Sequence, residues 1–229
     1  MRPLELSGVA KTFTVHLQDG LRLPVLQDLA FAAQPGECVV LVGPSGAGKS
    51  SVLKLIYGNY RCDEGAILVR DGDAVVDIAT AAPRQILSLR RHVLGYVTQF
   101  LRAVPRVSAL DVVAEALTDV PREAARDRAA AMLSRFNVPE RLWSLPPATF
   151  SGGEQQRVNL ARGLLPERPV VLLDEPTASL DAVNRAVVID IVRERKRQGV
   201  AIVAIVHDES VRDAIADTQI DVTRFSTAA

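Results

Sequence analysis

The sequence predicts an α/β fold that carries a helical insertion, and three observations support this prediction. Val170–Leu173 and Val200–Val206 are continuous runs of β-branched residues and leucine, which suit strands covered on both faces. Ala182–Arg197, between these runs, has the pattern of a crossover helix. From Ser108 to about Leu165 the pattern is mostly helical, with few strand runs. Strands that alternate with helices in this way are typical of a parallel sheet with helices on its faces.

The composition is that of a globular protein with a substantial core. The chain has 229 residues, and its 48% hydrophobic and 24% charged residues exclude wholesale disorder. Basic and acidic side chains both number 27, so the formal net charge is zero. A neutral chain argues against a broad basic face for nucleic acid, while it leaves room for a local basic groove.

Neither export nor membrane insertion is predicted. The N-terminus lacks the apolar core of a secretory signal. The longest clean apolar run, Val200–Val206, is far shorter than the roughly 18 residues of a membrane span. Cys38 and Cys62 form no CxxC pair, which favours two buried thiols in a reducing compartment. We therefore expect a cytoplasmic protein without direct membrane insertion.

Short strands dominate the chain before the helical stretch. The expected strands are, in order, Leu4–Val9, Arg22–Ala33, Glu37–Val42, Gly65–Arg70, Ala74–Ile78 and Val93–Val97. Asp71-Gly72-Asp73, between the fourth and the fifth, is a hairpin signal. Lys49–Gly58 predicts a helix, and Arg122–Phe136 predicts another because Pro121 precedes it at a position that proline favours.

A glycine-rich phosphate-binding loop follows the third strand and opens a helix. Its sequence matches G-x-x-x-x-G-K-[ST] in the structural context that this motif requires. The glycines let several N–H groups face one anion, and the helix N-terminus adds its dipole. Lys49 suits the β- and γ-phosphates of a nucleotide, and Ser50 suits Mg²⁺. The predicted nucleotide-binding residues here are Gly43, Pro44, Ser45, Gly46, Ala47, Gly48, Lys49, Ser50 and Ser51.

A second buried strand ends in two adjacent carboxylates. Asp174 follows Val170–Leu173 and suits Mg²⁺ binding, directly or through water. Glu175 comes one residue later and can orient or deprotonate a water molecule beside the γ-phosphate. A pair of solvated charges at a strand end is the simpler interpretation, and the phosphate loop makes it the weaker one.

A serine and two glycines precede another helical run, Glu154–Leu164. Such a helix N-terminus can bind an anion, although a capping serine before an ordinary helix has the same appearance. The candidate residues for this second anion site are Ser151, Gly152, Gly153 and Glu154.

With these motifs in this order, the chain resembles the ATP-binding cassette (ABC) ATPase family over nearly its whole length. The resemblance implies a P-loop NTPase with an ABC-type nucleotide-binding domain. That domain has a RecA-like mixed-sheet core, an N-terminal antiparallel β subdomain and a helical insertion. It would occupy residues 1–229, with the core at 1–98 and 166–229 and the helical subdomain at about 99–165. The implied ligands are ATP and Mg²⁺.

The resemblance also implies roles for single residues. Phe13 stands where the family has an aromatic ring that stacks on adenine, and Gln99 stands at its glutamine loop, which touches Mg²⁺. Ser179-Leu180-Asp181 resembles the family's D-loop, and His207 resembles its switch histidine. The expected catalytic residues are Lys49, Gln99, Glu175 and His207, and the expected metal-binding residues are Ser50, Gln99 and Asp174.

In that family the Ser-Gly-Gly segment serves ATP bound to the opposite subunit. The resemblance therefore implies a head-to-tail dimer around two ATP molecules, formed with a second copy or with a companion ABC ATPase. Two departures stand out, because the signature usually reads LSGGQ and tyrosine is commoner at position 13. Phe150 and Glu154 flank the phosphate-facing residues and leave them intact, and Phe13 keeps the ring face that stacking needs.

Segments outside the nucleotide motifs predict a more particular role. Gln99–Leu110, Asn137–Trp143, Gly20–Leu26 and His207-Asp208-Glu209 resemble the L-subunit family of the bacterial carbon–phosphorus lyase system. That resemblance implies a cytosolic ATPase without a permease, which supports phosphonate breakdown. Its expected partners are soluble core subunits that make ribose 1-phosphonate 5-triphosphate from ATP and phosphonate.

Two alternatives stay open. Gln99–Leu101 and Pro105 are shared with the ATPase motors of lipoprotein-releasing and macrolide-type exporters. In such a transporter the groove around Gln99–Arg106 would receive a coupling helix of the permease. The second alternative is an ABC ATPase that acts on nucleic acid. Those proteins usually add coiled-coil arms, zinc modules or a second cassette, and none of these is recognisable in the sequence.

Overall fold

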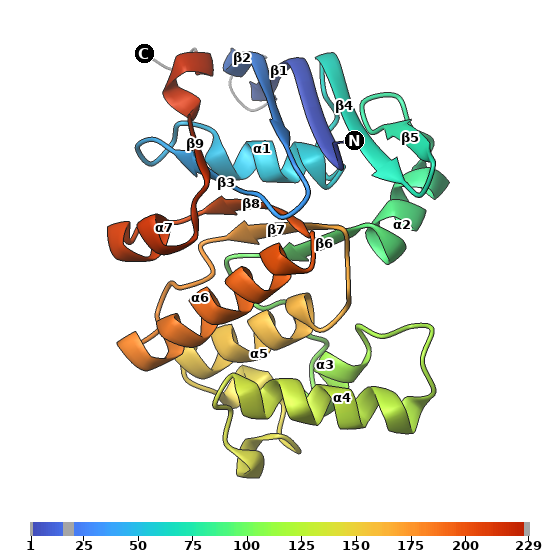
Figure 1. Ribbon diagram of the computed structural model, residues 1–229, viewed down its shortest axis with the longest axis vertical. Coiled ribbons are helices and arrows are strands. Elements are labelled where there is room, and N and C mark those ends of the chain that lie inside the picture. Colours follow the sequence, from blue (N-terminus) through green and yellow to red (C-terminus); the bar gives the residue numbers. More distant parts are fainter. Residues whose placement is uncertain (1, 16–20, 227–229) are drawn as a thin grey trace.

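The computed structural model describes residues 2–15 and 21–226 and arranges them as two sheets with surrounding helices (Figure 1). The strands are β1 Leu4–Val15, β2 Leu21–Ala33, β3 Cys38–Val42, β4 Glu64–Asp71, β5 Ala74–Asp77, β6 Leu94–Val97, β7 Val170–Asp174, β8 Ala201–Ile205 and β9 Thr218–Asp221. The α-helices are α1 Lys49–Ile56, α2 Pro83–His92, α3 Ala109–Ala114, α4 Arg122–Arg135, α5 Gly152–Leu164, α6 Ala182–Arg197 and α7 Glu209–Ile215. Short 3-10 helices cover Glu140–Leu142, Pro147–Thr149 and Val222–Phe225. Gly20, in a segment used for the family resemblance, and His16, to which we assign no role, lie outside the described residues.

The N-terminal sheet is antiparallel, with the strand order β2-β1-β4-β5. β4 and β5 form the hairpin that the sequence predicts, because Asp71 pairs with Ala74 across a loop of Gly72 and Asp73. The predicted antiparallel subdomain is therefore confirmed, and β1 is longer than expected because it continues to Val15.

The second sheet is parallel, with the strand order β6-β7-β8-β3-β9. Alternate residues of β3, β7 and β8 face two different cores. In β3, Val39 and Leu41 pack with α1 and the antiparallel sheet, whereas Cys38 and Val40 pack with the helices on the other side. Both faces of these strands are therefore buried, which explains why their sequences are apolar without alternation. The predicted α/β core is confirmed.

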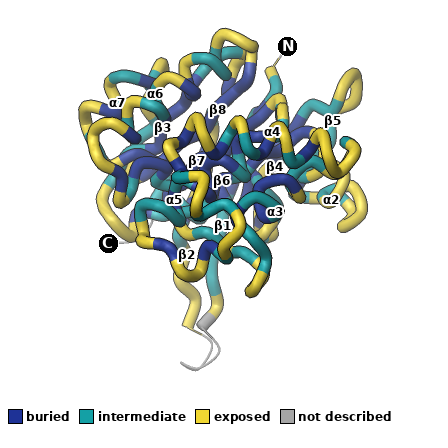
Figure 2. Tube along the Cα trace, turned by 90° about the horizontal axis from the view of Figure 1, so that it is seen from below, coloured by how far each residue is buried: buried dark blue, intermediate teal, exposed yellow. Residues whose placement is uncertain are grey.

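The helices lie in layers on the two faces of the parallel sheet. α1 lies between the two sheets, and α5 and α6 cover the opposite face (Figure 1). α3 and α4 pack beyond α5, where the fully buried Phe136 and Leu133 join Val158 in one core. Seen from below, the parallel strands are dark blue in the middle and the outer helices and loops carry the exposed yellow (Figure 2). Among the residues that the structure describes, no helix has both the length and the apolarity needed to cross a bilayer.

The sequence did not predict α2, α7 or β9. Each is short and mostly polar, so its hydrophobic pattern is weak. In α2 the buried residue is Leu89, and in α7 the buried residues are Val211 and Ile215. β9 has no fully buried residue and lies at the edge of the parallel sheet, where it pairs with β3 alone. Tertiary contacts, rather than local sequence, stabilise these elements.

Gly65 offers a test of the close approach between β4 and β1, the two central strands of the antiparallel sheet. Its backbone is left-handed at φ +83°, and a Cβ there would lie 2.3 Å from the carbonyl oxygen of Gly8. Gly72 is also left-handed, at φ +60°, but has open space around the Cβ position. We expect Gly72→Ala to cost about 1–2 kcal/mol of unfolding free energy and Gly65→Ala to cost clearly more. Urea unfolding of both variants measures this, and equal losses would contradict the steric argument.

Candidate active site

The phosphate loop wraps around the ammonium group of its own lysine. Gly43, Gly46 and Gly48 have φ values of 138°, 86° and 94°, which only glycine adopts readily. Lys49 Nζ donates to the carbonyl oxygens of Gly43 and Pro44, at 2.8 Å each. The lysine is only 7% exposed, and burial lowers its pKa, while the nearby carboxylates of Glu175 and Asp174 oppose this shift. The loop therefore holds a positive charge at the N-terminus of helix α1.

A cavity of about 340 Å³ opens above this loop. It is lined by Val25, Ser45, Gly46, Gly48, Lys49, Ser50, Ser51, Glu175 and His207. The parallel sheet thus brings the phosphate loop together with Glu175 and His207, which lie more than a hundred positions later in the chain. An anion held by the loop would lie beside both a carboxylate and an imidazole.

Asp174 is buried at the end of β7, and two hydroxyl groups hold it. Ser50 Oγ donates to Asp174 Oδ1 at 3.1 Å, and the phenol of Tyr96 donates to Oδ2 at 3.2 Å. Burial raises the pKa of Asp174, although both hydrogen bonds act in the opposite direction. Burial, together with the charge of Asp174, also raises the pKa of Tyr96, which therefore stays a proton donor. Sequence analysis missed Tyr96, because a tyrosine in a short apolar strand gives no signal of its own.

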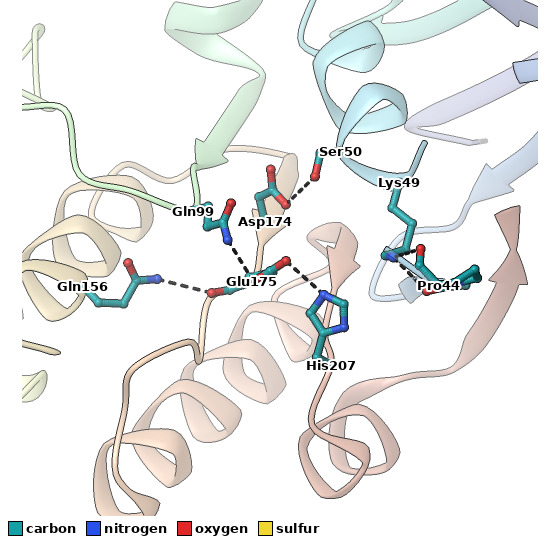
Figure 3. A network of polar contacts seen from close by, with 9 residues as sticks. Pro44, Lys49, Ser50, Gln99, Gln156, Asp174, Glu175 and His207 are labelled. Atoms are coloured by element: carbon teal, nitrogen blue, oxygen red, sulfur yellow. Dashed lines mark hydrogen bonds and ion pairs between the residues drawn. The ribbon is translucent and has the colours of Figure 1, made fainter. Parts of the chain in front are cut away.

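Glu175 is the meeting point of three segments, as Figure 3 shows. His207 Nε2 lies 2.9 Å from Glu175 Oε1, and Gln99 Nε2 donates to Oε2 at 3.1 Å. The backbone of Glu175 is left-handed at φ 51°, an unusual conformation for a residue with a side chain. Strain of this kind concentrates at functional sites, where surrounding contacts fix it. The structure therefore brings Gln99, Glu175 and His207 together.

Helix α5 supports this arrangement through two buried amides. Gln156 Nε2 donates to the carbonyl oxygen of Pro176 at 3.1 Å, and Asn159 Nδ2 donates to that of Thr98 at 2.6 Å. Both side chains are nearly inaccessible to solvent, so their loss would leave buried carbonyls without partners. Two polar residues three positions apart in the helix gave only a weak signal in the sequence.

The Ser-Gly-Gly segment lies away from the phosphate loop of its own chain, and none of its residues lines the cavity described above. Ser151 caps α5, and the Glu154 carboxylate accepts from Ser151 N at 2.9 Å and from its Oγ at 2.7 Å. These bonds hold the pKa of Glu154 below its usual range. A Cβ on Gly153 would lie 2.9 Å from the carbonyl oxygen of Ser179, so this glycine also permits close packing.

Phe13 lies apart from the phosphate cavity and does not line it. Its ring meets that of Tyr60 edge to face, with 5.0 Å between the centroids, and Lys11 Nζ lies 5.4 Å from the Phe13 centroid. Lys11 in turn pairs with Asp63 at 2.8 Å. These contacts hold the half-buried ring in place.

The oxygen donors near Ser50 fit magnesium. Mg²⁺ prefers hard oxygen ligands, and in nucleotide sites it takes one or two carboxylates together with substrate phosphates. The Ser50 hydroxyl and the Asp174 carboxylate are already in contact. Gln99 is close to them, because its amide donates to Glu175, the residue that follows Asp174 in the chain. Within the described ranges, no cluster of three or more His, Cys, Asp or Glu side chains is suited to holding a metal ion. The ion would therefore depend on the nucleotide for further ligands.

Fold and site together define a P-loop nucleoside triphosphatase. More particularly, the chain belongs to the ABC transporter family, whose model matches residues 26–178. Among solved structures, the dimeric post-hydrolysis state of the ATP-binding cassette MJ0796 bound to ADP and Pi has a TM-score of 0.83 and 26% identity, covering 95% of this chain and 96% of that one. The chain is an ATPase that binds ATP with Mg²⁺.

Two relatives carry named functions. A lipoprotein-releasing system ATP-binding protein, LolD of Maricaulis maris, is 38% identical over 211 residues, which cover 91% of this chain and 89% of that protein. A macrolide export ATP-binding/permease protein, MacB of Sodalis glossinidius, is 33% identical over 234 residues, which cover 96% of this chain and 35% of that protein. The chain therefore matches nearly all of one relative but only about a third of the other.

These relatives correct the assignment predicted from the segments outside the nucleotide motifs. LolD and MacB belong to lipoprotein-releasing and macrolide-export systems, and they favour the exporter alternative over phosphonate breakdown. The prediction of a carbon–phosphorus lyase subunit, with soluble lyase partners and no permease, is therefore wrong. Its basis was sequence outside the nucleotide motifs, which the shared fold leaves free to vary.

Asp174 yields a prediction about stability and pH. Because burial raises its pKa in the folded state, the protein loses stability as the pH rises through that raised pKa. Asp174→Asn removes the charge, and its amide can still accept from Ser50 and donate to the Tyr96 oxygen. Above neutral pH we expect the melting temperature of the variant to be higher by roughly 2–4 °C, which corresponds to about 1 kcal/mol of unfolding free energy for a chain of this size.

Thermal unfolding across a pH series, without nucleotide or Mg²⁺, measures this difference. The gap between Asp174→Asn and the unmodified protein should narrow as the pH falls. Asp190→Asn, at an exposed position of α6, should show no such pH-dependent gap. A variant that is less stable at every pH would contradict the electrostatic argument.

Proposed function

We propose that this protein is the ATPase motor of an ABC transporter of the lipoprotein-releasing or macrolide-export kind. The observation that supports this most strongly is the relationship to LolD, which extends over nine-tenths of both chains. The ATPase would lie on the cytoplasmic side of a membrane, bound to a permease partner. The substrate of that transporter is not part of the proposal.

In the proposed mechanism the phosphate loop binds the triphosphate of ATP. Backbone N–H groups of the loop and the Lys49 ammonium would contact the β- and γ-phosphates. Ser50, Asp174 and Gln99 would hold Mg²⁺, which supplies charge stabilisation at the phosphates when it is bound. Phe13 would stack on adenine through a ring face, as the family resemblance implies. Most of the catalysis would be electrostatic.

The proposed general base is Glu175. Its carboxylate would orient a water molecule against the γ-phosphate and accept the proton that the water loses. His207 and Gln99 each contact one oxygen of this carboxylate, which fixes its orientation. The His207 loop is itself anchored, since Asp208 caps α7 and pairs with Arg185 at 2.8 Å. His207 would link Glu175 to the γ-phosphate.

We further propose that Ser151, Gly152, Gly153 and Glu154 act on ATP bound to a second cassette. Their position outside the phosphate cavity of their own chain supports this role. The ATP-binding cassette MJ0796, to which this chain is similar, has a dimeric structure. The working division of the chain is a core of residues 1–98 and 166–229 and a helical subdomain of about 99–165. The second cassette would be another copy or a companion ATPase.

The loop after β6 is the proposed contact with the permease. Phe100 is 72% exposed and Val104 is 63% exposed, which are high values for large apolar side chains in one short loop. The same loop begins with Gln99, whose amide contacts Glu175. A partner seated on this loop would therefore act close to the proposed general base.

Glu175→Gln tests the catalytic part of the proposal. Glutamine has nearly the same shape and its amide oxygen can still accept one of the two hydrogen bonds, but it cannot accept a proton. We expect ATP hydrolysis to fall on the order of 100-fold or more, while ATP binding persists and an ATP-dependent dimer accumulates. Phosphate release and size-exclusion chromatography measure the two effects. Glu123→Gln, on the exposed side of α4, is the control, and normal turnover of Glu175→Gln would refute the assigned role.

Phe100→Asp tests the transporter part. The protein would be tagged at native level in the Glu175→Gln background, and detergent-solubilised partners would be identified by mass spectrometry. We expect a polytopic membrane protein to co-purify, and we expect Phe100→Asp to lose it. Leu87→Asp changes a comparably exposed leucine, 64% exposed, on α2 and should retain the partner. Recovery of soluble proteins without any permease would overturn the proposal.

A further inference from the structure

Tyr96 contacts the buried carboxylate of Asp174, and the proposed mechanism gives this tyrosine no role. It lies on β6, which pairs in parallel with β7 so that Tyr96 stands opposite Leu172. Its hydroxyl reaches the end of the neighbouring strand and donates to Asp174 Oδ2 at 3.2 Å. The sheet therefore places a hydrogen-bond donor beside a proposed metal ligand, on a strand that supplies no part of the phosphate loop.

The two oxygens of Asp174 have one hydroxyl donor each. Ser50 Oγ donates to Oδ1 at 3.1 Å, and the Tyr96 phenol donates to Oδ2. Within residues 2–15 and 21–226, no other side chain donates to this carboxylate. Two bonds to different oxygens fix the plane of the carboxylate, whereas one bond alone leaves it free to turn about that contact. Tyr96 is therefore needed to define the orientation of the group.

The ring of Tyr96 is held in turn by two stacked side chains. Its centroid lies 5.0 Å from that of Tyr57, with the two planes tilted by 58°. The guanidinium carbon of Arg90 lies 4.6 Å from the Tyr57 centroid, and Arg90 Nε donates to the Tyr57 carbonyl oxygen at 2.9 Å. Contacts of both kinds stabilise packed aromatic rings. The phenol therefore has a fixed position and does not simply follow the carboxylate.

Mg²⁺ is more sensitive to the orientation of its ligands than Ca²⁺ is. Mg²⁺ requires near-ideal octahedral geometry at short distances, whereas Ca²⁺ accepts more ligands at longer distances in flexible arrangements. A carboxylate that turned away from its position would therefore weaken the binding of Mg²⁺ more than that of Ca²⁺. Replacing a side chain that orients a metal ligand typically lowers metal affinity by about 10–100-fold.

We propose that Tyr96 is a positioning residue that orients Asp174 for Mg²⁺ and gives the ATP site its preference for Mg²⁺ over Ca²⁺. This inference rests on the proposed function, because Asp174 is a metal ligand of the proposed mechanism. It adds the residue that determines how tightly, and how selectively, that ligand acts. Tyr96 would act through Asp174 and would touch neither the nucleotide nor the metal.

A simpler interpretation is that the Tyr96 hydroxyl only satisfies a buried carboxylate. In that case Tyr96→Phe would lower the stability of the fold and would leave the effect of metal on nucleotide binding unchanged. A positioning role predicts instead a loss that appears only with the metal and that depends on which metal is present. Nucleotide binding measured with and without metal separates the two interpretations.

The experiment measures binding of mant-AMP-PNP, a fluorescent ATP analogue that resists hydrolysis, to the purified full chain. Fluorescence titrations are carried out with saturating Mg²⁺, with saturating Ca²⁺ and with EDTA. The affinity with each cation, divided by the affinity in EDTA, gives the contribution of that cation. For Tyr96→Phe we expect an unchanged affinity in EDTA and a Mg²⁺ contribution that is about tenfold smaller. The decrease in the Ca²⁺ contribution should be clearly smaller.

Tyr57→Phe is the matched control. It removes a hydroxyl from the same stack, but this hydroxyl makes no hydrogen bond to Asp174, and the ring is kept. We expect its Mg²⁺ contribution to equal that of the unmodified chain. Thermal unfolding without nucleotide or metal checks that both variants are folded. In a second readout, Tyr96→Phe should need about tenfold more Mg²⁺ for half-maximal phosphate release.

An unchanged Mg²⁺ contribution in Tyr96→Phe would overturn the inference, and so would an equal decrease in Tyr57→Phe. Equal losses with Mg²⁺ and Ca²⁺ would overturn the selectivity, and a loss already present in EDTA would show a structural role only. Because the titrations need neither ATP hydrolysis nor a permease, their failure is distinguishable from failure of the proposed function. The outcomes of Glu175→Gln and Phe100→Asp would stand in either case.

Discussion

The parallel pairing of three neighbouring strands is the constraint on which the site depends. Ile205 of β8 pairs with Leu41 of β3 on one side and with Asp174 of β7 on the other. The three strands therefore end at one level, and whatever follows them meets at one edge of the sheet. The phosphate loop follows β3, Glu175 follows β7, and His207 follows β8. A shift in this register would separate them all.

The site buries ionisable groups at an electrostatic cost to the stability of the fold, and a bound ligand can reduce this cost. Lys49 and Asp174 are both almost completely buried, and burial shifts the pKa of each towards its neutral form. Hydrogen bonds from Ser50 and Tyr96 compensate Asp174 only in part. Active sites commonly sacrifice stability in this way. The unusual backbone of Glu175 belongs to the same pattern, because contacts from Gln99 and His207 hold it in place.

ATP hydrolysis and its use are encoded in different parts of the molecule. The sheet edge defines the ATPase, whereas the loop from Gln99 to Arg106 carries exposed apolar side chains. Relatives named for lipoprotein release and macrolide export share the first part, and the fold itself does not specify the second. The outward surfaces are therefore where this ATPase would be distinguished from others of its family.

The sequence alone determined the phosphate loop, the acidic end of β7, the buried strands and the β4–β5 hairpin, because each depends on residues close together in the chain. The sequence did not predict short polar elements such as α2 and β9, since contacts with distant segments stabilise them. The tertiary structure alone decided that Tyr96 and Gln156 support the site. Their contacts join segments separated by tens of residues, and no local pattern records such distances.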